Sequence, residues 1–530
     1  MLTGQNGILN KTNESKKQTE NSKEKEAIEL AITSIQINNL GVNEITKQDL
    51  DEALKSQLPS KVNFHITDKG NHNFVIEFDN TNNRYYIDNS GKIISNIDTL
   101  KISSEKELKA FRDSVNSGNT FEGKYIYLTN DIELDINESW TPIGCLTDYS
   151  STPYADINNR FSGVFDGNNH EISGIYIDTN DKVQGLFGLV DSGSILNLNI
   201  GISNIQGGNA TAGIVGYLYN ESVISNCTNN SNITAGFGGG IVGCSYFNNR
   251  IIDSSNFGNI TGKNQIGGIV GLCTKNGSIE NCNNNGVIQG KMSIGGIAGI
   301  IDTEISIINC QNSSNVTGEE KVGGISGEAS QGIFDKCRNA GTIKSDGTAG
   351  GILGQLQKNG IVKNSANSAL ISGKGFNGGI VGFNNNSNVE TSFNIGNIEG
   401  ENNNTGGICG KNYNNAVMES CYNVGLVTSS GYYTGGIIGS NQDSTVSNCY
   451  NTGKVQCTNK SGGIVGYAVS GNIYNAFFLE GVVNEGNGSI VTGVQYINDT
   501  DMKKLYTNLG KNFLEDINNI NNGYPILNWQ

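Results

Sequence analysis

The segment 267–294 reads GGIVGLCTKNGSIENCNNNGVIQGKMSI, and the segment 295–322, of equal length, reads GGIAGIIDTEISIINCQNSSNVTGEEKV. Both begin with Gly-Gly-Ile, carry Ile-x-Asn-Cys near the middle, and place an Asn two residues after that Cys. Two successive copies of one unit predict a stacked repeat, because periods of about 20 to 50 residues are typical of solenoids.

The same unit recurs over much of the chain. The motif Gly-[Ile/Leu]-x-Gly returns at intervals of 27 to 29 residues, which random sequence does not produce ten times in succession. The first Gly of each copy is Gly185, Gly213, Gly240, Gly268, Gly296, Gly324, Gly351, Gly379, Gly407, Gly436 and Gly463.

Aligned copies form columns of similar side chains. The residue after the first Gly is always Ile from the second copy onward: Ile214, Ile241, Ile269, Ile297, Ile325, Ile352, Ile380, Ile408, Ile437 and Ile464. A column of small residues follows: Cys227, Ser254, Cys282, Cys310, Cys337, Ser365, Ser392, Cys421, Cys449 and Ala476. Two residues later stands Asn, except for Phe478 in the last copy: Asn229, Asn256, Asn284, Asn312, Asn339, Asn367, Asn394, Asn423 and Asn451.

A β-branched residue stands six positions after the small column in every copy, from Ile233 to Val482. These columns are too closely spaced, with Gly, Asn and Ser between them, for helices. We predict about three short strands and three turns per unit, stacked in parallel at ~4.8 Å into a right-handed β-helix of the pectin-lyase-like kind. No Pro occurs between Pro153 and Pro525, which fits strands that need every N–H.

The Asn column predicts a ladder of amides. Each side chain can donate to one neighbouring turn and accept from the other, so we expect the ladder at an inward-facing turn. For the Gly of the motif two explanations stand side by side: a positive φ, or a tight corner where no Cβ fits.

Six of the 11 cysteines lie in the small column, where Ser and Ala replace them in other copies. We therefore interpret these cysteines as residues that fill a small volume, and not as reactive thiols. Cys282, Cys310 and Cys337 fall on successive turns, but in-register stacking keeps Cβ atoms too far apart for a disulfide. We therefore predict reduced, buried thiols. No C-x-x-C spacing occurs, which argues against a zinc or redox site, and no metal or cofactor is expected.

The composition excludes some partners. The chain has 72 Gly, 80 Asn and only 4 Pro among 530 residues, and its formal net charge is −15. Such an acidic protein cannot displace counterions from phosphates, so nucleic acid and anionic membrane are not expected as partners. No run of 18 apolar residues is present.

The repeat divides the chain into four regions: 1–100, 101–184, 185–483 and 484–530. For the first we predict a small α+β domain with an amphipathic helix at 22–37, a second helix capped by Thr46 with Asp49, and a four-stranded meander. The second holds a helix at 104–118 that covers the open end of the stack and the first coils. The third is the β-helix, and the fourth is a C-terminal cap with a short helix at 501–509.

Beyond the repeat, the chain contains WTPIG at 140–144, FSGVFDGNNHEISGI at 161–175, GLFG at 185–188 and the ending NNGYPILNWQ at 521–530. With the GGIVG units, these segments resemble the GLUG-repeat proteins of bacterial surfaces over about 430 residues. The resemblance implies an extracellular or cell-surface location.

The first region contains LTGQNGILNK at 2–11, EKEAIELA at 24–31 and YYIDNSGKI at 85–93. These segments resemble the body of clostridial type IV pilin-like surface proteins. In that family a short basic stretch and a long apolar helix precede this point. We expect Met1 to be an internal Met, or residues 1–25 to be a disordered polar tail, and membrane contact only through a segment that precedes residue 1.

Two catalytic interpretations follow from these resemblances. GLUG repeats also occur in IgA-specific metallopeptidases, but His65, His72 and His170 cannot form H-E-x-x-H, so that hypothesis is rejected. Many parallel β-helices are polysaccharide lyases or hydrolases, which need clustered carboxylates or a base beside calcium. Charged residues in the repeats scatter over different offsets, and Asp131 and Asp166 suit turns better than catalysis.

The prediction is a non-catalytic, rod-like surface protein, an adhesin or scaffold; a lyase or hydrolase of acidic glycans is the alternative. The expected partner is a surface protein or glycan of a host or neighbouring cell. Some aromatic residues either stack on sugars or pack turns: Tyr217, Tyr246, Phe247, Phe383, Tyr413, Tyr432, Tyr433 and Tyr467.

Overall fold

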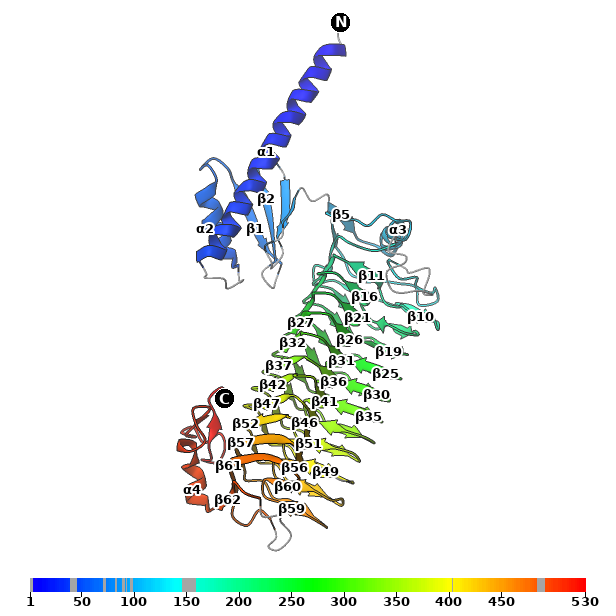
Figure 1. Ribbon diagram of the computed structural model, residues 1–530. Helices are drawn as coiled ribbons and strands as arrows, with labels where there is room; N and C mark the ends of the chain where they lie inside the picture. Colours follow the sequence, from blue (N-terminus) through cyan, green and yellow to red (C-terminus); the bar gives the residue numbers. More distant parts are fainter. Residues whose placement is uncertain are drawn as a thin grey trace.

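The computed structural model describes residues 3–38, 45–69, 73–81, 83–87, 91, 93–95, 99–144, 159–402, 404–483 and 491–530, with the backbone alone for 3–18, 37–38 and 94–95. A small helix-and-sheet domain is followed by a long stack of strands and a short C-terminal segment (Figure 1). The predicted fold class is confirmed, because the chain is mainly β and forms a parallel β-solenoid of about 13 turns.

The N-terminal domain packs two helices on an antiparallel sheet of order β1-β2-β3-β4. Ile28, Ile32 and Ile35 of the first helix are buried, whereas Leu30 is 49% exposed. Thr46 caps the second helix, and the predicted capping box with Asp49 is present. The elements are α1 (Thr3–Asn38), α2 (Lys47–Gln57), β1 (Phe64–Asp68), β2 (Phe74–Phe78), β3 (Asn83–Ile87) and β4 (Ile93–Ser95). The first helix therefore begins well before the predicted residue 22.

One turn of the solenoid contains five short strands, so the prediction of three was wrong. Equivalent strands of successive turns pair in parallel and build sheets of 11, 11, 10 and 26 strands. A representative turn consists of β16 (Val215–Tyr219), β17 (Val223–Ser225), β18 (Thr228–Asn229), β19 (Asn232–Ala235) and β20 (Gly238–Gly239).

One of the two extra divisions comes from a left-handed residue. Asn226, with φ +52°, bends the chain between β17 and β18, immediately before the small column. The same position has φ between 41° and 57° in the other nine copies that carry the small column, at Asp253, Asn281, Asn309, Lys336, Asn364, Thr391, Ser420, Asn448 and Asn475. Asn and Asp occupy seven of the ten positions. Among residues other than Gly, their short polar side chains tolerate this conformation best.

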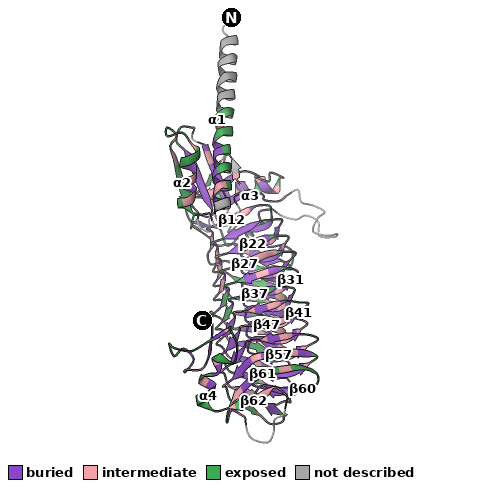
Figure 2. Cartoon of the chain, turned by 60° about the vertical axis from the view of Figure 1, so that its left-hand side comes forward, coloured by how far each residue is buried: buried purple, intermediate pink, exposed green. Residues whose placement is uncertain are grey.

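The core of the solenoid is formed by the predicted columns. All ten Ile residues of the motif have 0% exposure, and the β-branched column from Ile233 to Val482 is at most 6% exposed. Figure 2 shows buried residues along the whole length of the stack. Each turn thus buries its apolar side chains on those of the turns before and after it.

The Asn ladder is present over nine turns. From Asn229 to Asn451, each side-chain Nδ2 donates to Oδ1 of the next Asn at 2.7–2.9 Å. Each Nδ2 also donates to the backbone carbonyl two residues later, as Asn339 does to Gly341 at 2.9 Å. The amides are buried, at 0–1% exposure, so the ladder satisfies polar groups inside the solenoid.

The first Gly of the motif is required by space and not by φ. A Cβ on Gly351 would lie 2.0 Å from the carbonyl oxygen of Gly379 and 2.6 Å from the Cβ of Asn367. None of the ten Gly residues from Gly213 onward has a positive φ. For these ten residues the tight corner is confirmed and the positive φ is wrong, whereas Gly185 in the first copy has φ +157°.

The cysteines in the described part of the chain are free thiols, and nine of those ten are buried. Cys310, for example, donates from Sγ to the carbonyls of Ile308 and Ile279, each at 3.4 Å. Burial raises the pKa of Cys337 to about 12. The prediction of reduced, buried thiols is confirmed for the nine buried residues, which include all six of the small column; Cys457 is partly exposed, and Cys145 lies outside the described residues.

Helix α3 (Glu105–Asn116) closes the N-terminal end of the solenoid, as predicted. Its Leu108, Phe111 and Val115 are buried in the solenoid core. The Phe111 ring lies 5.8 Å from that of Phe165. Parallel pairing begins just before the helix, where β5 (Thr99–Ile102) pairs with β6 (Tyr125–Leu128).

The C-terminal segment lies along the side of the solenoid and not across its end (Figure 1, Figure 2). The last long strand, β61 (Gly471–Leu479), pairs with β62 (Val494–Ile497). Then follow α4 (Asp499–Lys503), the 3-10 helix η1 (Leu505–Thr507), β63 (Phe513–Leu514) and β64 (Ile526–Leu527). These elements cover a stacked ladder of aromatic rings, Phe393, Tyr422 and Tyr450, whose neighbours are 5.0 Å apart and 4° from parallel.

Candidate binding face

One sheet of the solenoid presents aromatic side chains outward. In β16, Leu218 lies in the solenoid core, whereas Tyr217 and Tyr219 on either side of it belong to a separate apolar cluster, in which Tyr219 is buried and Tyr217 is partly exposed. We call the third and fifth residues of the strands of this sheet the outer face. The strands are β11 (Phe187–Asp191), β16, β21 (Val242–Tyr246), β26 (Val270–Thr274), β31 (Ala298–Asp302), β36 (Ser326–Ser330), β41 (Leu353–Gln357), β46 (Val381–Asn385), β51 (Cys409–Tyr413), β56 (Ile438–Gln442) and β60 (Val465–Ala468).

The first aromatic cluster consists of Tyr217 and Tyr219 on β16, Tyr246 at the end of β21, and Phe247 directly after it. The rings of Tyr219 and Tyr246 are stacked, with centroids 5.1 Å apart. The Lys275 ammonium lies 4.5 Å from the centroid of Phe247. The cluster therefore combines a partly exposed aromatic surface with one cation.

The second aromatic cluster lies six turns further along and consists of Phe376, Phe383 and Tyr413. Ring centroids of Phe376 and Phe383 are 5.4 Å apart, and those of Phe383 and Tyr413 are 6.3 Å apart. Lys411 Nζ lies 4.7–5.9 Å from all three ring centroids. A third group follows, in which Tyr433 stacks on Tyr467 at 4.4 Å.

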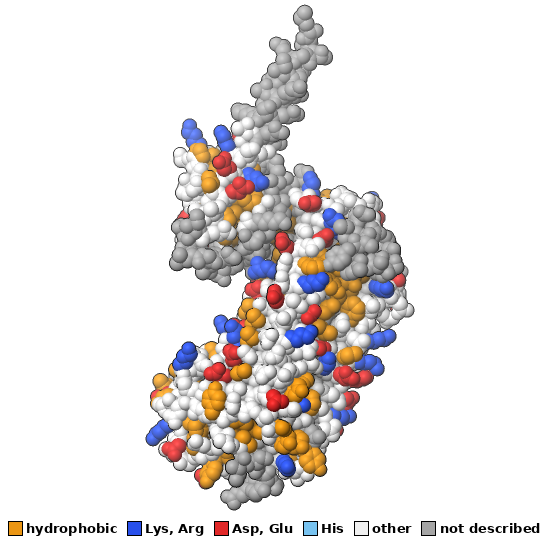
Figure 3. Space-filling model, viewed as in Figure 1, with side chains coloured by type: hydrophobic (Ala, Val, Ile, Leu, Met, Phe, Trp, Pro, Cys, Tyr) orange, Lys and Arg blue, Asp and Glu red, His pale blue; other side chains and the backbone are white. Residues whose placement is uncertain are grey.

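Polar side chains separate the clusters. Glu328 accepts from Lys321 Nζ at 2.8 Å and from Gln357 Nε2 at 3.0 Å. Gln355 shares the register column of Glu328 and Phe383, and Gln442 that of Tyr413. On this face, Figure 3 shows hydrophobic side chains in an upper and a lower area with charged ones between them.

The structure brings the eight aromatic candidates to this face or its edge. The aromatic candidates from the sequence did not include Tyr219 and Phe376, and Lys411 was not a candidate, although all three belong to the clusters. A positional signal was available for Lys411, since Tyr217, Phe383, Lys411 and Tyr467 each stand four residues after the first Gly of their repeat.

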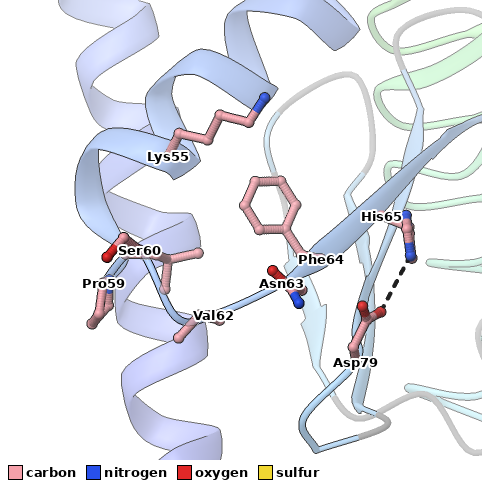
Figure 4. A pocket seen from close by; sticks show the side chains of 9 residues that line it. Lys55, Pro59, Ser60, Val62, Asn63, Phe64, His65 and Asp79 are labelled. Carbon is pink, nitrogen blue, oxygen red and sulfur yellow. Dashed lines mark ion pairs between the residues drawn. The ribbon is translucent and has the colours of Figure 1, made fainter.

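A separate pocket of about 420 Å³ lies in the N-terminal domain between α2 and β1. Figure 4 shows Phe64 between Lys55 and the pair His65 and Asp79, whose Nε2 and Oδ1 are 3.4 Å apart. The His65 side chain is 74% exposed, so water competes for this pair and weakens it.

An acidic groove of about 630 Å³ lies beside the first coils and is lined by Glu105, Glu133, Asp135 and Glu171. Hydrogen bonding from Lys109 and from the Asp135 backbone lowers the pKa of Glu105. Hydrogen bonds from the backbone and side chain of Asn137 lower the pKa of Asp135. Within the described ranges, no three His, Cys, Asp or Glu side chains converge as metal ligands.

The other sequence candidates for catalysis are paired structurally. His170 Nδ1 lies 3.0 Å from Asp131 Oδ1, and that carboxylate also accepts from the backbone N–H of Glu171. These two contacts lower the pKa of Asp131, the backbone contribution being the larger. Asp166 is fully buried, and His72 lies outside the described residues. Among the helices that the structure describes, none is both long and apolar enough to cross a membrane.

Comparison with known proteins gives a limited result. The GLUG motif matches residues 430–456, which correspond to about one repeat. Curated proteins give no significant match. One solved structure, from Bacteroides ovatus and described as a "putative immunoglobulin A1 protease", aligns over 81% of this chain and 92% of its own, at 18% identity and a TM-score of 0.30.

Proposed function

We propose that the protein is a non-catalytic, rod-like surface protein whose outer face binds a neutral glycan. One observation carries the proposal: aromatic clusters recur on one face of a rigid rod, at β16–β21, at β46–β51 and near β60. The GLUG motif is typical of extracellular bacterial proteins, which supports a surface location.

The chemistry of the outer face suits carbohydrate. Aromatic rings offer flat apolar surfaces for the C–H faces of sugars, and amides such as Gln355 and Gln442 offer donors and acceptors for hydroxyl groups. The net charge of −15 disfavours an acidic glycan. Six turns separate the first two clusters, or about 29 Å at ~4.8 Å per turn, so one extended chain could contact both.

Glycan-array binding of the full chain tests the proposal. The double variant Phe383→Ala/Tyr413→Ala should lose at least tenfold in affinity for the glycan that binds. Tyr474, on β61 of another sheet and 52% exposed, provides the matched control, and Tyr474→Ala should bind like the wild type. Equal loss in both variants, or no glycan bound at all, would refute the proposal.

The alternative is a polysaccharide hydrolase or lyase that uses the acidic groove. The groove favours this function because it gathers four carboxyl groups at one site. A general acid, however, needs a raised pKa, and the pKa values of Glu105 and Asp135 are lowered. Glycan cleavage by the wild type that is lost in Glu133→Gln and Glu171→Gln would establish the enzyme.

We also propose that the N-terminal region is pilin-like and that a segment preceding residue 1 anchors the rod outside the cell. The exposed side of α1 within residues 19–36 and the short, capped α2 are compatible with such an arrangement. Reading the gene upstream of Met1 tests the anchor, and protease shaving of intact cells tests exposure. Absence of an apolar coding segment upstream, together with protection from added protease, would contradict it.

A further inference from the structure

The junction between the N-terminal domain and the solenoid contains a fully buried carboxylate. Asp166, the last residue of β8 (Val164–Asp166), has 0% exposure. Val75 and Tyr86 from the N-terminal domain form one apolar cluster here with Tyr125, Val164 and Leu196 from the first coils. Lys69 of the N-terminal domain pairs with Asp166, with its Nζ 3.0 Å from Oδ2.

Each oxygen of Asp166 has its own set of partners. Oδ1 accepts from the backbone N–H of Asn168 at 2.8 Å and from Asn197 Nδ2 at 3.0 Å. Oδ2 accepts from the Tyr125 hydroxyl and faces the Lys69 ammonium. The Lys69 side chain is 18% exposed, and its Nζ lies 5.9 Å from the centre of the Tyr125 ring.

This arrangement contains the groups that amide formation requires. A lysine in an apolar site is a nucleophile once it loses its proton. Two N–H donors on Oδ1 stabilise the negative charge that develops when the carboxyl carbon is attacked. A phenol on Oδ2 can protonate the departing oxygen. Burial, and secondly the charge of Asp166, raise the pKa of Tyr125 well above its usual value, so the phenol keeps its proton.

The geometry points to an intramolecular isopeptide bond between Lys69 and Asp166, formed by the protein itself, that ties the N-terminal domain to the solenoid. A mechanical reason supports it, because a rod that binds at its side transmits force to this junction. The ion pair alone would be weak here, since removing two charges from water offsets most of their attraction.

The reaction balances without a co-reactant. A proton passes from Lys69 Nζ to Asp166 Oδ2, which leaves a neutral amine and a neutral carboxylic acid. Nζ then forms a bond to Cγ, and the carbonyl electron pair moves to Oδ1. Tyr125 gives its proton to Oδ2 and regains one from Nζ. The electron pair on Oδ1 re-forms the carbonyl as the Cγ–Oδ2 bond breaks, and Oδ2 leaves as water. Ammonium and carboxylate have become one amide and one water molecule.

Mass spectrometry of the purified full chain tests this inference. The intact mass should be lower than the sequence mass by one water molecule. A tryptic digest should contain a branched peptide that joins Lys69 to Asp166. An intact mass equal to that of the sequence, with both peptides found only in linear form, overturns the inference.

Matched variants distinguish loss of the isopeptide bond from loss of folding. Lys69→Arg keeps the positive charge but removes the nucleophile, so the mass deficit should disappear while the circular dichroism spectrum is retained. Lys101 on the neighbouring strand β5 serves as the control, because its Nζ lies 5.9 Å from the centroid of the Tyr127 ring. The variant Lys101→Arg should keep the mass deficit. Tyr125→Phe should slow formation at least tenfold. A deficit that persists in Lys69→Arg contradicts the assignment.

Discussion

Asn339 donates from Nδ2 to Oδ1 of Asn367 at 2.7 Å, across 28 residues of sequence and one turn of the solenoid. Asn339 also accepts from Asn312 Nδ2 at 2.8 Å and donates to the Gly341 carbonyl at 2.9 Å. One side chain therefore satisfies polar groups on three successive turns. This explains why the amide recurs where apolar residues would otherwise fill the interior.

Replacement of Asn339 by Leu should destabilise the protein by about 3–5 kcal/mol, because each buried partner left unsatisfied costs about 1–3 kcal/mol. Urea unfolding followed by circular dichroism measures the change. Gln311, an exposed residue in the same sheet, gives the control, and Gln311→Ala should change stability by less than ~0.5 kcal/mol. Similar stability for Asn339→Leu and wild type would show that the ladder contributes nothing.

Gly351→Ala should destabilise far more than Gly481→Ala, because the two glycines serve different purposes. A Cβ at Gly351 collides with backbone and with Asn367, whereas at Gly481, with φ +81°, it meets nothing within 4 Å. For Gly481 the cost is only the left-handed strain of about 1–2 kcal/mol. Comparing the two melting temperatures tests this order, and the reverse order would contradict it.

Lys336→Asn should stabilise the protein by about 0.5–1 kcal/mol, because Asn tolerates the left-handed conformation better than Lys. Lys336 has φ +57° at the position where most turns carry Asn or Asp. Lys344, an exposed residue in the extended strand β39 (Ile343–Ser345), provides the control. The midpoint of thermal unfolding should rise in Lys336→Asn and should stay unchanged in Lys344→Asn.

The sequence predicted the axis of the solenoid and the columns along it, since identical side chains can recur at a fixed period only if they stack. It did not predict how the chain bends within a turn. The bend at Asn226 depends on a single φ, and Asn is so abundant in this sequence that its role there was not distinguishable. The outer face was predicted only as a set of aromatic residues. Which of them are exposed depends on how the side chains of β16 and its equivalent strands alternate between the core and the outside.

The buried thiols should make stability fall at high pH. Burial raises the pKa values of Cys227, Cys273, Cys337 and Cys409 from 9.0 to about 12. Below pH 9 both states hold the proton, whereas between about pH 9 and 12 only the unfolded chain releases it. Each thiol then costs up to about 1.4 kcal/mol per pH unit. Urea midpoints from pH 7 to 11 should decline above pH 9, and substitution of Cys337 by Ser should reduce the slope.

The C-terminal segment should detach without unfolding the solenoid. Phe513 packs on the rings of Tyr422 and Tyr450, with centroids 6.5 and 5.7 Å apart, and Trp529 Nε1 donates to the Thr391 carbonyl at 2.8 Å. Phe513→Ala removes the central contact and should weaken docking by about 3 kcal/mol or more. Limited proteolysis should then cleave after residue 498 at least tenfold faster, while the circular dichroism of the remaining fragment stays β-rich.

Leu514, 48% exposed on the same strand β63, supplies the control, because Leu514→Ala leaves the packed side intact. Global unfolding of Phe513→Ala would instead show that this segment is an integral part of the solenoid core.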